Sequence, residues 1–219
     1  MDPSQRLLLT VSREALLDAN IDINSLKGEN MGVFIASSGN FCDSGIVSNQ
    51  TFIPSIGSDQ SGSSIYAMTG ASIAVASGRL SYTYGLNGPC MSIDTACSSS
   101  LVAIHTASRS LQFGDCTSAM VAGVNVLSLK ASIACAMAGM LSQDGKCHTF
   151  DESANGYSRG EGCGVIILKR LSDALRDNDK IYAVIKGSAV MQDGKSVSLT
   201  APNGLAQEKL IQAALSNSK

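Results

Sequence analysis

Cys97 lies in a run of residues whose types and order suit nucleophilic chemistry. Asp94, Thr95 and Ala96 precede it and three serines follow it, so its surroundings are small and polar and pack a core poorly. A short strand-like run over 90–93 leads into a turn, and a helical pattern begins beside the cysteine. The unpaired N–H groups at a helix start favour a thiolate, the nucleophilic form. We therefore interpret Cys97 as a nucleophile able to attack a carbonyl carbon, although free cysteines are more often buried structural residues.

A nucleophile usually needs a partner base, and the chain contains 2 histidines. His105 falls on the same predicted helix as Cys97, about 12 Å further along the axis, which is outside hydrogen-bond reach. We interpret His105 as a packing or surface residue. His148 lies in a predicted loop and is the only candidate base. The sequence thus predicts a good nucleophile without a convincing histidine base.

Two other polar segments could contribute to a site. Asp151, Arg159 and Glu161 stand among glycines and could form a buried ion network that positions a loop. Glu161 could instead act as an acid or base, but the structural role is favoured. The Gly-x-Gly elements here lack the strand, loop and helix of a nucleotide site. Residues 192–204 are typical of a turn leading into a helix, and a substrate-lining role stays open.

The spacing of apolar residues predicts the elements that must position these groups. Helices are expected over 3–19, 65–80, from Cys97 to about Phe113, 131–140, 171–177 and 205–216. Strands are expected over 31–37, 90–94, 118–126, 162–169 and 181–189, with a polar loop over 38–64. Alternating strands and helices favour a layered α/β domain, and no linker or repeat marks an internal boundary.

Composition excludes several classes of protein. The chain has 219 residues with 16 basic and 18 acidic side chains, so charge gives no case for nucleic acid or an anionic membrane as partner. Its 7 cysteines are irregularly spaced, which argues against a disulfide framework or a zinc site. No signal peptide or membrane-length apolar run is present, so we expect a cytoplasmic protein with reduced thiols.

The block from Asp94 to Leu101 resembles the active-site signature of β-ketoacyl synthases, in the form found in modular polyketide synthases. The likeness extends along the chain in ordered blocks. Residues 2–9 are similar to the family's DPQQRLLL segment, although Ser4 replaces a glutamine. Further blocks are similar to family motifs over 78–89, 144–151, 156–162 and 192–204, with Met191 where asparagine is common.

This resemblance implies a thiolase-like fold of layers α/β/α/β/α and an acyltransferase of polyketide or fatty acid biosynthesis. Cys97 would take an acyl chain from an acyl carrier protein as a thioester. A malonyl-type extender on a second carrier would lose carbon dioxide, and its carbanion would attack that thioester. The resemblance implies no directly bound cofactor or metal, since phosphopantetheine carries the substrates. It also implies a homodimer of the full domain.

Several parts of the family pattern are missing from this sequence. The HGTGT and GH motifs, whose histidines assist decarboxylation and hold the oxyanion, are absent, and the family's opening strand is missing. We therefore expect residues 1–219 to be the N-terminal half of a ketosynthase domain, incomplete at both ends and not competent to condense alone. Two alternatives stay open. One is a cysteine-dependent thioester hydrolase or acyltransferase using His148, and the other is a non-catalytic fragment.

Overall fold

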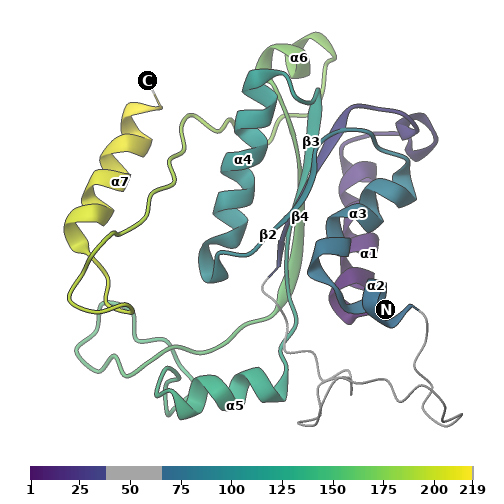
Figure 1. The fold of residues 1–219 in the computed structure, drawn as a ribbon. Coiled ribbons are helices and arrows are strands. Elements are labelled where there is room, and N and C mark those ends of the chain that lie inside the picture. Colours follow the sequence, from purple (N-terminus) through teal and green to yellow (C-terminus); the bar gives the residue numbers. More distant parts are fainter. Residues whose placement is uncertain (38–65, 219) are drawn as a thin grey trace, which may run out of the picture.

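A four-stranded mixed sheet forms the centre of the computed structural model, which describes residues 1–37 and 66–218 (Figure 1). The predicted loop over 38–64 lies outside the described residues. The strand order is β2-β1-β3-β4, where the strands are β1 Met31–Ser37, β2 Cys90–Ile93, β3 Ser118–Asn125 and β4 Gly162–Lys169. β1 runs parallel to β2 and β3, and β4 runs antiparallel to β3. The carboxyl ends of three strands and the start of β4 therefore meet at one edge of the sheet.

Helices α1 (Pro3–Asp18) and α3 (Ile73–Tyr84) cover one face of the sheet (Figure 1). The first helix begins where the Asp2 carboxylate accepts the Ser4 N–H at 2.8 Å, and proline occupies its first turn. Apolar side chains at helical spacing enter the core beneath these helices, including Leu8, Leu16 and Leu80. The sequence prediction of a helix over 3–19 is confirmed.

Helix α4 (Ser99–Phe113) covers the opposite face. Its inward positions carry Ala103 and Ala107, which are fully buried against Phe34 and Val121 of the sheet. Alanines at a four-residue interval lie on one face of the helix and let it approach the strands closely. The ring of Phe34 fills the space beside these small side chains. The tight packing fixes the start of α4, and with it the residues that precede the helix.

Truncation of Phe34 is expected to destabilise the fold strongly. Phe34→Ala should lower the free energy of unfolding by about 3–5 kcal/mol, because the ring is fully buried between β1 and α4 and its loss leaves a cavity. Urea unfolding followed by circular dichroism measures the change. Phe113→Ala is the matched control, since that ring is 79% exposed and its removal should change stability little. Equal effects of the two substitutions would contradict the packing described here.

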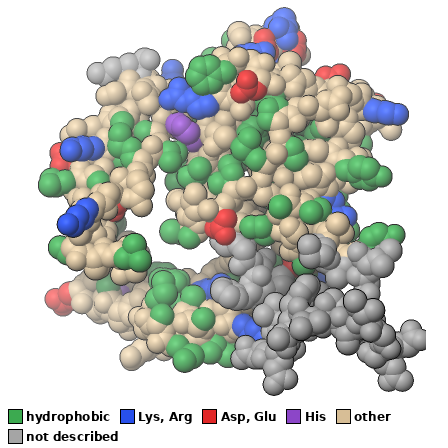
Figure 2. Space-filling model, in the orientation of Figure 1, with side chains coloured by type: hydrophobic (Ala, Val, Ile, Leu, Met, Phe, Trp, Pro, Cys, Tyr) green, Lys and Arg blue, Asp and Glu red, His purple; other side chains and the backbone are tan. Residues whose placement is uncertain are grey.

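The remaining helices lie around this three-layered centre. They are α2 (Ala67–Ala71), α5 (Leu129–Met137), α6 (Leu171–Arg176) and α7 (Gly204–Ser216). Figure 2 shows hydrophobic side chains on the arm that carries α7 and on α5, with an open gap between that arm, α4 and α5. Exposed apolar residues in these parts include Leu205, Ile211 and Leu215 of α7, and Leu129 and Met137 of α5. The central strands β1 and β3 are thus well covered, whereas the outer strands β2 and β4 are partly exposed and α5 and α7 present apolar side chains to solvent.

Two sequence predictions differ from the structure. The helix expected over 65–80 breaks at Ser72, because its carbonyl and that of Thr69 accept hydrogen bonds from the Gln5 side chain of α1. The strand expected over 181–189 is extended but has no ladder partner among the described residues, so it is not a strand of a sheet. It lies instead against α7, where a Cβ on Gly187 would stand 2.6 Å from the Ala214 carbonyl oxygen.

Candidate active site

Cys97 lies at the junction between β2 and α4, as the sequence predicts. β2 ends at Ile93, and Cys97 occupies a 3₁₀ turn over Ala96–Ser98 that runs directly into α4. The cysteine is exposed and free. Ile93 pairs with Ala36 at the carboxyl end of β1, so the turn stands at the edge of the sheet where ligands of open α/β folds bind.

The small polar residues around Cys97 hold this turn in shape. Ala96 has a φ of 54°, in the left-handed region that costs energy for a residue other than glycine. Its N–H donates to the Asp94 carboxylate at 3.0 Å, and the Thr95 N–H donates to the Ser99 hydroxyl oxygen at 2.8 Å. The Ser99 hydroxyl in turn donates to the Ala96 carbonyl at 2.6 Å. The polar residues therefore fix a strained backbone that presents Cys97 to solvent at the start of a helix.

Gly123 of β3 lets the start of α4 approach the sheet. A Cβ built at Gly123 would stand 2.4 Å from the Ser100 hydroxyl oxygen, far inside contact distance. Gly123 pairs with Gly164 of β4, where a Cβ would meet no atom within 4 Å. The space beside Gly123 is therefore taken up by the start of α4, whereas the space beside Gly164 is open.

Gly123→Ala is expected to reduce the reactivity of Cys97, because the new methyl group would take the place of the Ser100 hydroxyl and crowd the first turn of α4, next to the cysteine. We expect the rate of alkylation at Cys97 to fall by about tenfold, since small displacements of a reacting group have large kinetic effects. The rate is measured by mass spectrometry of the Cys97 peptide. Gly164→Ala is the matched control and should react at the parent rate. A Gly123→Ala rate equal to the control would show that this contact does not position the cysteine.

The structure brings neither histidine into contact with Cys97 within its described part. The His105 ring bonds the Ser188 hydroxyl at 2.8 Å, and burial together with the Arg109 charge lowers the pKa of His105. The interpretation of His105 as a packing residue agrees with this contact. His148 is instead 2.9 Å from the Asp144 carboxylate, in the loop after α5. Hydrogen bonds from Ser142 and then from His148 hold the pKa of Asp144 at about 2.

The buried ion network expected among Asp151, Arg159 and Glu161 is wrong, because these charges are exposed or half-exposed and bond other groups. Arg159 donates to the Ser132 hydroxyl of α5 at 2.8 Å. Glu161 accepts the N–H of Leu127 at 3.0 Å, just before α5 begins. Arg159 and Glu161 therefore hold the loop between α5 and β4 by separate contacts with α5 and with the residue before it, which is the positioning role that the sequence favoured.

Sequence reasoning did not single out Tyr157, in the loop between α5 and β4. Burial raises the pKa of Tyr157, and its hydrogen bond with the Cys135 thiol of α5 adds to this effect. Tyr157 pairs its backbone with the segment after α5, donating its N–H to the Met140 carbonyl at 3.1 Å. The available signal was Gly156. Its φ of 134° favours glycine, and a Cβ there would clash with the backbone of Leu141 and Ser142, so only glycine allows this close approach.

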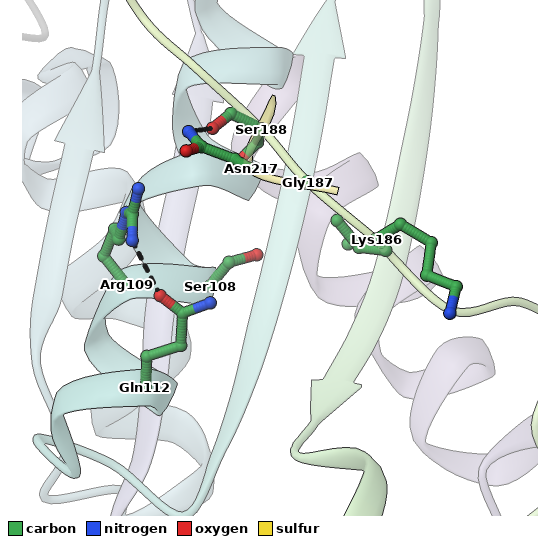
Figure 3. A pocket seen from close by; sticks show the side chains of 8 residues that line it. Ser108, Arg109, Gln112, Lys186, Gly187, Ser188 and Asn217 are labelled. Atoms are coloured by element: carbon green, nitrogen blue, oxygen red, sulfur yellow. Dashed lines mark hydrogen bonds between the residues drawn. The ribbon is translucent and has the colours of Figure 1, made fainter. Parts of the chain in front are cut away.

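The turn over 192–204 leads into α7 as the sequence predicts. Asn203 accepts the Ala206 N–H at the start of that helix, and its own N–H donates to the Asp193 carboxylate at 2.9 Å. A small pocket of about 150 Å³ lies elsewhere, between the later turns of α4 and the extended segment 185–188 (Figure 3). In this pocket Arg109 donates a hydrogen bond to Gln112, and Asn217 donates one to the Ser188 carbonyl. These polar groups of the lining are therefore hydrogen-bonded to one another.

Two other kinds of feature are absent from the described residues. No three or more histidine, cysteine or acidic side chains there are grouped to hold a metal ion. No described helix combines the length and apolar character needed to cross a membrane. Cys97 and its surroundings are thus the candidate site that the geometry supports.

Curated proteins similar to this chain are large polyketide synthases. A phenolphthiocerol synthesis polyketide synthase type I (Pks15/1) of Mycobacterium marinum is 49% identical over 219 residues, covering 99% of this chain and 10% of the relative. Polyketide synthase GfsA of Streptomyces halstedii is 44% identical over 220 residues, covering 99% of this chain and 3% of the relative. The chain therefore spans a tenth or less of the length of these two relatives.

The fold and the family models agree with these matches. A ketosynthase from module 6 of the bacillaene synthase of Bacillus subtilis 168 superposes with a TM-score of 0.85 at 35% identity, covering 100% of this chain and 35% of that one. The described layers are therefore those of the thiolase-like fold. The model for the beta-ketoacyl synthase N-terminal domain matches residues 1–174, and the model for the C-terminal domain matches 182–219. The chain belongs to the beta-ketoacyl synthase family.

Proposed function

We propose that this chain supplies the acyl-accepting part of a condensing enzyme of polyketide biosynthesis, an acyltransferase in which Cys97 is the catalytic nucleophile. The observation that carries the proposal is the exposed cysteine on a strained turn between β2 and α4, at the carboxyl edge of the sheet. Residues 1–219 would form part of one β-ketoacyl synthase domain, supported by the two family matches along the chain.

The reaction would begin with transfer of an acyl group to Cys97. The thiolate attacks the carbonyl carbon of a thioester, the carbon–sulfur bond to the donor breaks, and the donor thiol leaves with a proton. The donor would be an acyl group on the phosphopantetheine arm of an acyl carrier protein, so no separately bound cofactor is needed. α4 would assist, because the unpaired N–H groups of a helix's first turn favour negative charge at the helix start, where Cys97 lies.

Condensation would follow when a malonyl-type extender on a second carrier loses carbon dioxide. The resulting carbanion attacks the Cys97 thioester carbon, a carbon–carbon bond forms, and Cys97 leaves as the thiolate. Both histidines of this chain bond other residues, so the groups that assist decarboxylation are not assigned to them. The proposed protein is a homodimer in its full domain and acts in the cytoplasm.

Transfer from a loaded carrier protein tests this function. The chain is incubated with an acyl carrier protein that bears a radiolabelled butyryl group, and label on the chain is measured after separation under denaturing conditions. Cys97→Ala should accept no label, whereas Cys90→Ala, which removes another exposed cysteine, should accept as much as the parent. Equal labelling of the Cys97→Ala chain would contradict the proposal.

The thioester hydrolase expected as an alternative would need His148 to act on Cys97. The structure offers no support, since His148 bonds Asp144 instead. A hydrolase would release the acyl group as a free acid with turnover, whereas an acyl-accepting cysteine retains it. The transfer experiment therefore also separates these two functions, and a chain that accepts no acyl group corresponds to the non-catalytic alternative.

A further inference from the structure

Ala96, the residue directly before Cys97, adopts a backbone conformation that strains an alanine. Its φ of 54° lies in the left-handed region, where the alanine Cβ crowds the following carbonyl oxygen and a glycine would not. The dihedral angles of Ala96 also set the direction in which the chain enters Cys97. If Ala96 relaxed to a negative φ, the Cys97 side chain would turn away from its present position. The surrounding structure must therefore hold Ala96 in the strained state.

The Ser99 hydroxyl bonds the backbone on both sides of the Ala96 Cα. It accepts the Thr95 N–H at 2.8 Å, and it donates its own proton to the Ala96 carbonyl oxygen at 2.6 Å. A hydroxyl can do this because it is a donor and an acceptor at once. The two bonds close a loop that contains the φ and ψ angles of Ala96. They therefore favour the strained conformation, in which both bonds form together.

Ser99 holds Ala96 from a more protected position than the other polar side chains of the turn. Ser99 is 4% exposed at the start of α4, so water competes little for its two hydrogen bonds. Asp94 accepts the Ala96 N–H at 3.0 Å, but from an exposed position. The Ser98 hydroxyl is also exposed, and it bonds Thr95, one residue before the strained one. Ser99 is thus the buried link between Ala96 and α4.

Resting on the proposed function, we propose that Ser99 is a positioning residue for the acylation of Cys97. Its hydroxyl holds Ala96 in the left-handed conformation, and that conformation aims the Cys97 sulfur at an incoming thioester. Ser99 acts through the backbone and makes or breaks no bond of the reaction. Loss of the hydroxyl lets Ala96 relax, so a smaller fraction of the chains presents the sulfur correctly. The acylation rate falls in proportion to that fraction.

Removal of the hydroxyl tests this role. The chain is incubated with butyryl-N-acetylcysteamine, and the initial rate of acylation at Cys97 is measured by mass spectrometry. The Cys97 thiolate forms the new carbon–sulfur bond, and N-acetylcysteamine leaves as the protonated thiol. Ser99→Ala should lower this rate by about tenfold, a factor that the loss of one hydrogen bond accounts for. Ser110→Ala is the matched control, since it removes another buried serine hydroxyl of α4, far from the turn, and should react at the parent rate.

A second substitution separates positioning from a general loss of stability. Ala96→Gly added to Ser99→Ala should restore most of the lost rate, because glycine adopts a φ of 54° without the help of the hydroxyl. A chain that was merely destabilised would gain no rate from a change confined to this dihedral angle. Urea unfolding of each variant, followed by circular dichroism, measures stability separately from the rate.

The pair Ser99→Thr and Ser99→Val repeats the comparison without leaving an empty space beside α4. The two side chains have the same shape, but only Ser99→Thr keeps a hydroxyl, so it should react about tenfold faster than Ser99→Val. A Ser99→Ala rate equal to the parent, no gain from Ala96→Gly, or equal rates in this pair would overturn the inference. Absence of acylation in the parent chain would instead contradict the proposed function of Cys97.

Discussion

Iodoacetamide at less than one equivalent is expected to alkylate Cys97 before the other cysteines of the chain. Cys97 is exposed on the strained turn that leads into α4, so its sulfur stands at the open start of a helix where a reagent can reach it. Cys116 is buried, and burial raises the pKa of its thiol and of the half-buried Cys163 thiol, so both should react slowly. Peptide mass mapping at short times measures the order of reaction.

Exposure alone does not account for this preference, because Cys90 and Cys147 are also exposed. Cys90 lies on the edge strand β2, and Cys147 accepts the Ser158 N–H at 3.2 Å in the loop after α5. These two cysteines are therefore the internal controls. Labelling of Cys90 and Cys147 at the rate of Cys97 would show that the helix start gives no advantage. Equal labelling of all cysteines, including buried Cys116, would contradict the fold itself.

We also expect the isolated chain to perform only the first half of the condensing reaction, the acylation of Cys97. The isolated chain should accept an acyl group at Cys97, yet release carbon dioxide from a malonyl carrier no faster than Cys97→Ala. Its 2 histidines bond Ser188 and Asp144, so neither is placed to assist decarboxylation. Release of labelled carbon dioxide from carboxyl-labelled malonyl carrier measures this step. Turnover above the Cys97→Ala control would show that other residues of the chain assist decarboxylation.

The layered centre could be predicted from the sequence because its elements are specified locally. The strands over 31–37 and 162–169 are found with the expected bounds, since continuous or alternating apolar runs define them. The junction that carries Cys97 was also predicted, because a strand, a small-residue turn and a helix follow each other directly in the chain.

The differences arise where distant residues decide the local structure. The break at Ser72 depends on the Gln5 side chain of α1, which no local pattern reveals. The segment over 181–189 has the apolar residues of a strand, but a strand also needs a hydrogen-bonded neighbour, and the described residues supply none. Tyr157 is held by a turn at Gly156 and a backbone hydrogen bond to Met140, so its place in the fold could not be found from spacing alone.

The identity of the acylated residue tests the central claim most directly. The chain is incubated with butyryl-N-acetylcysteamine, digested, and mapped by mass spectrometry for the butyryl adduct. We predict one adduct, on the peptide that contains Cys97, and none on any cysteine of the Cys97→Ala chain. An adduct on another residue while Cys97 stays unmodified, or adducts spread over all cysteines, would contradict the assignment of Cys97 as the acyl-accepting nucleophile.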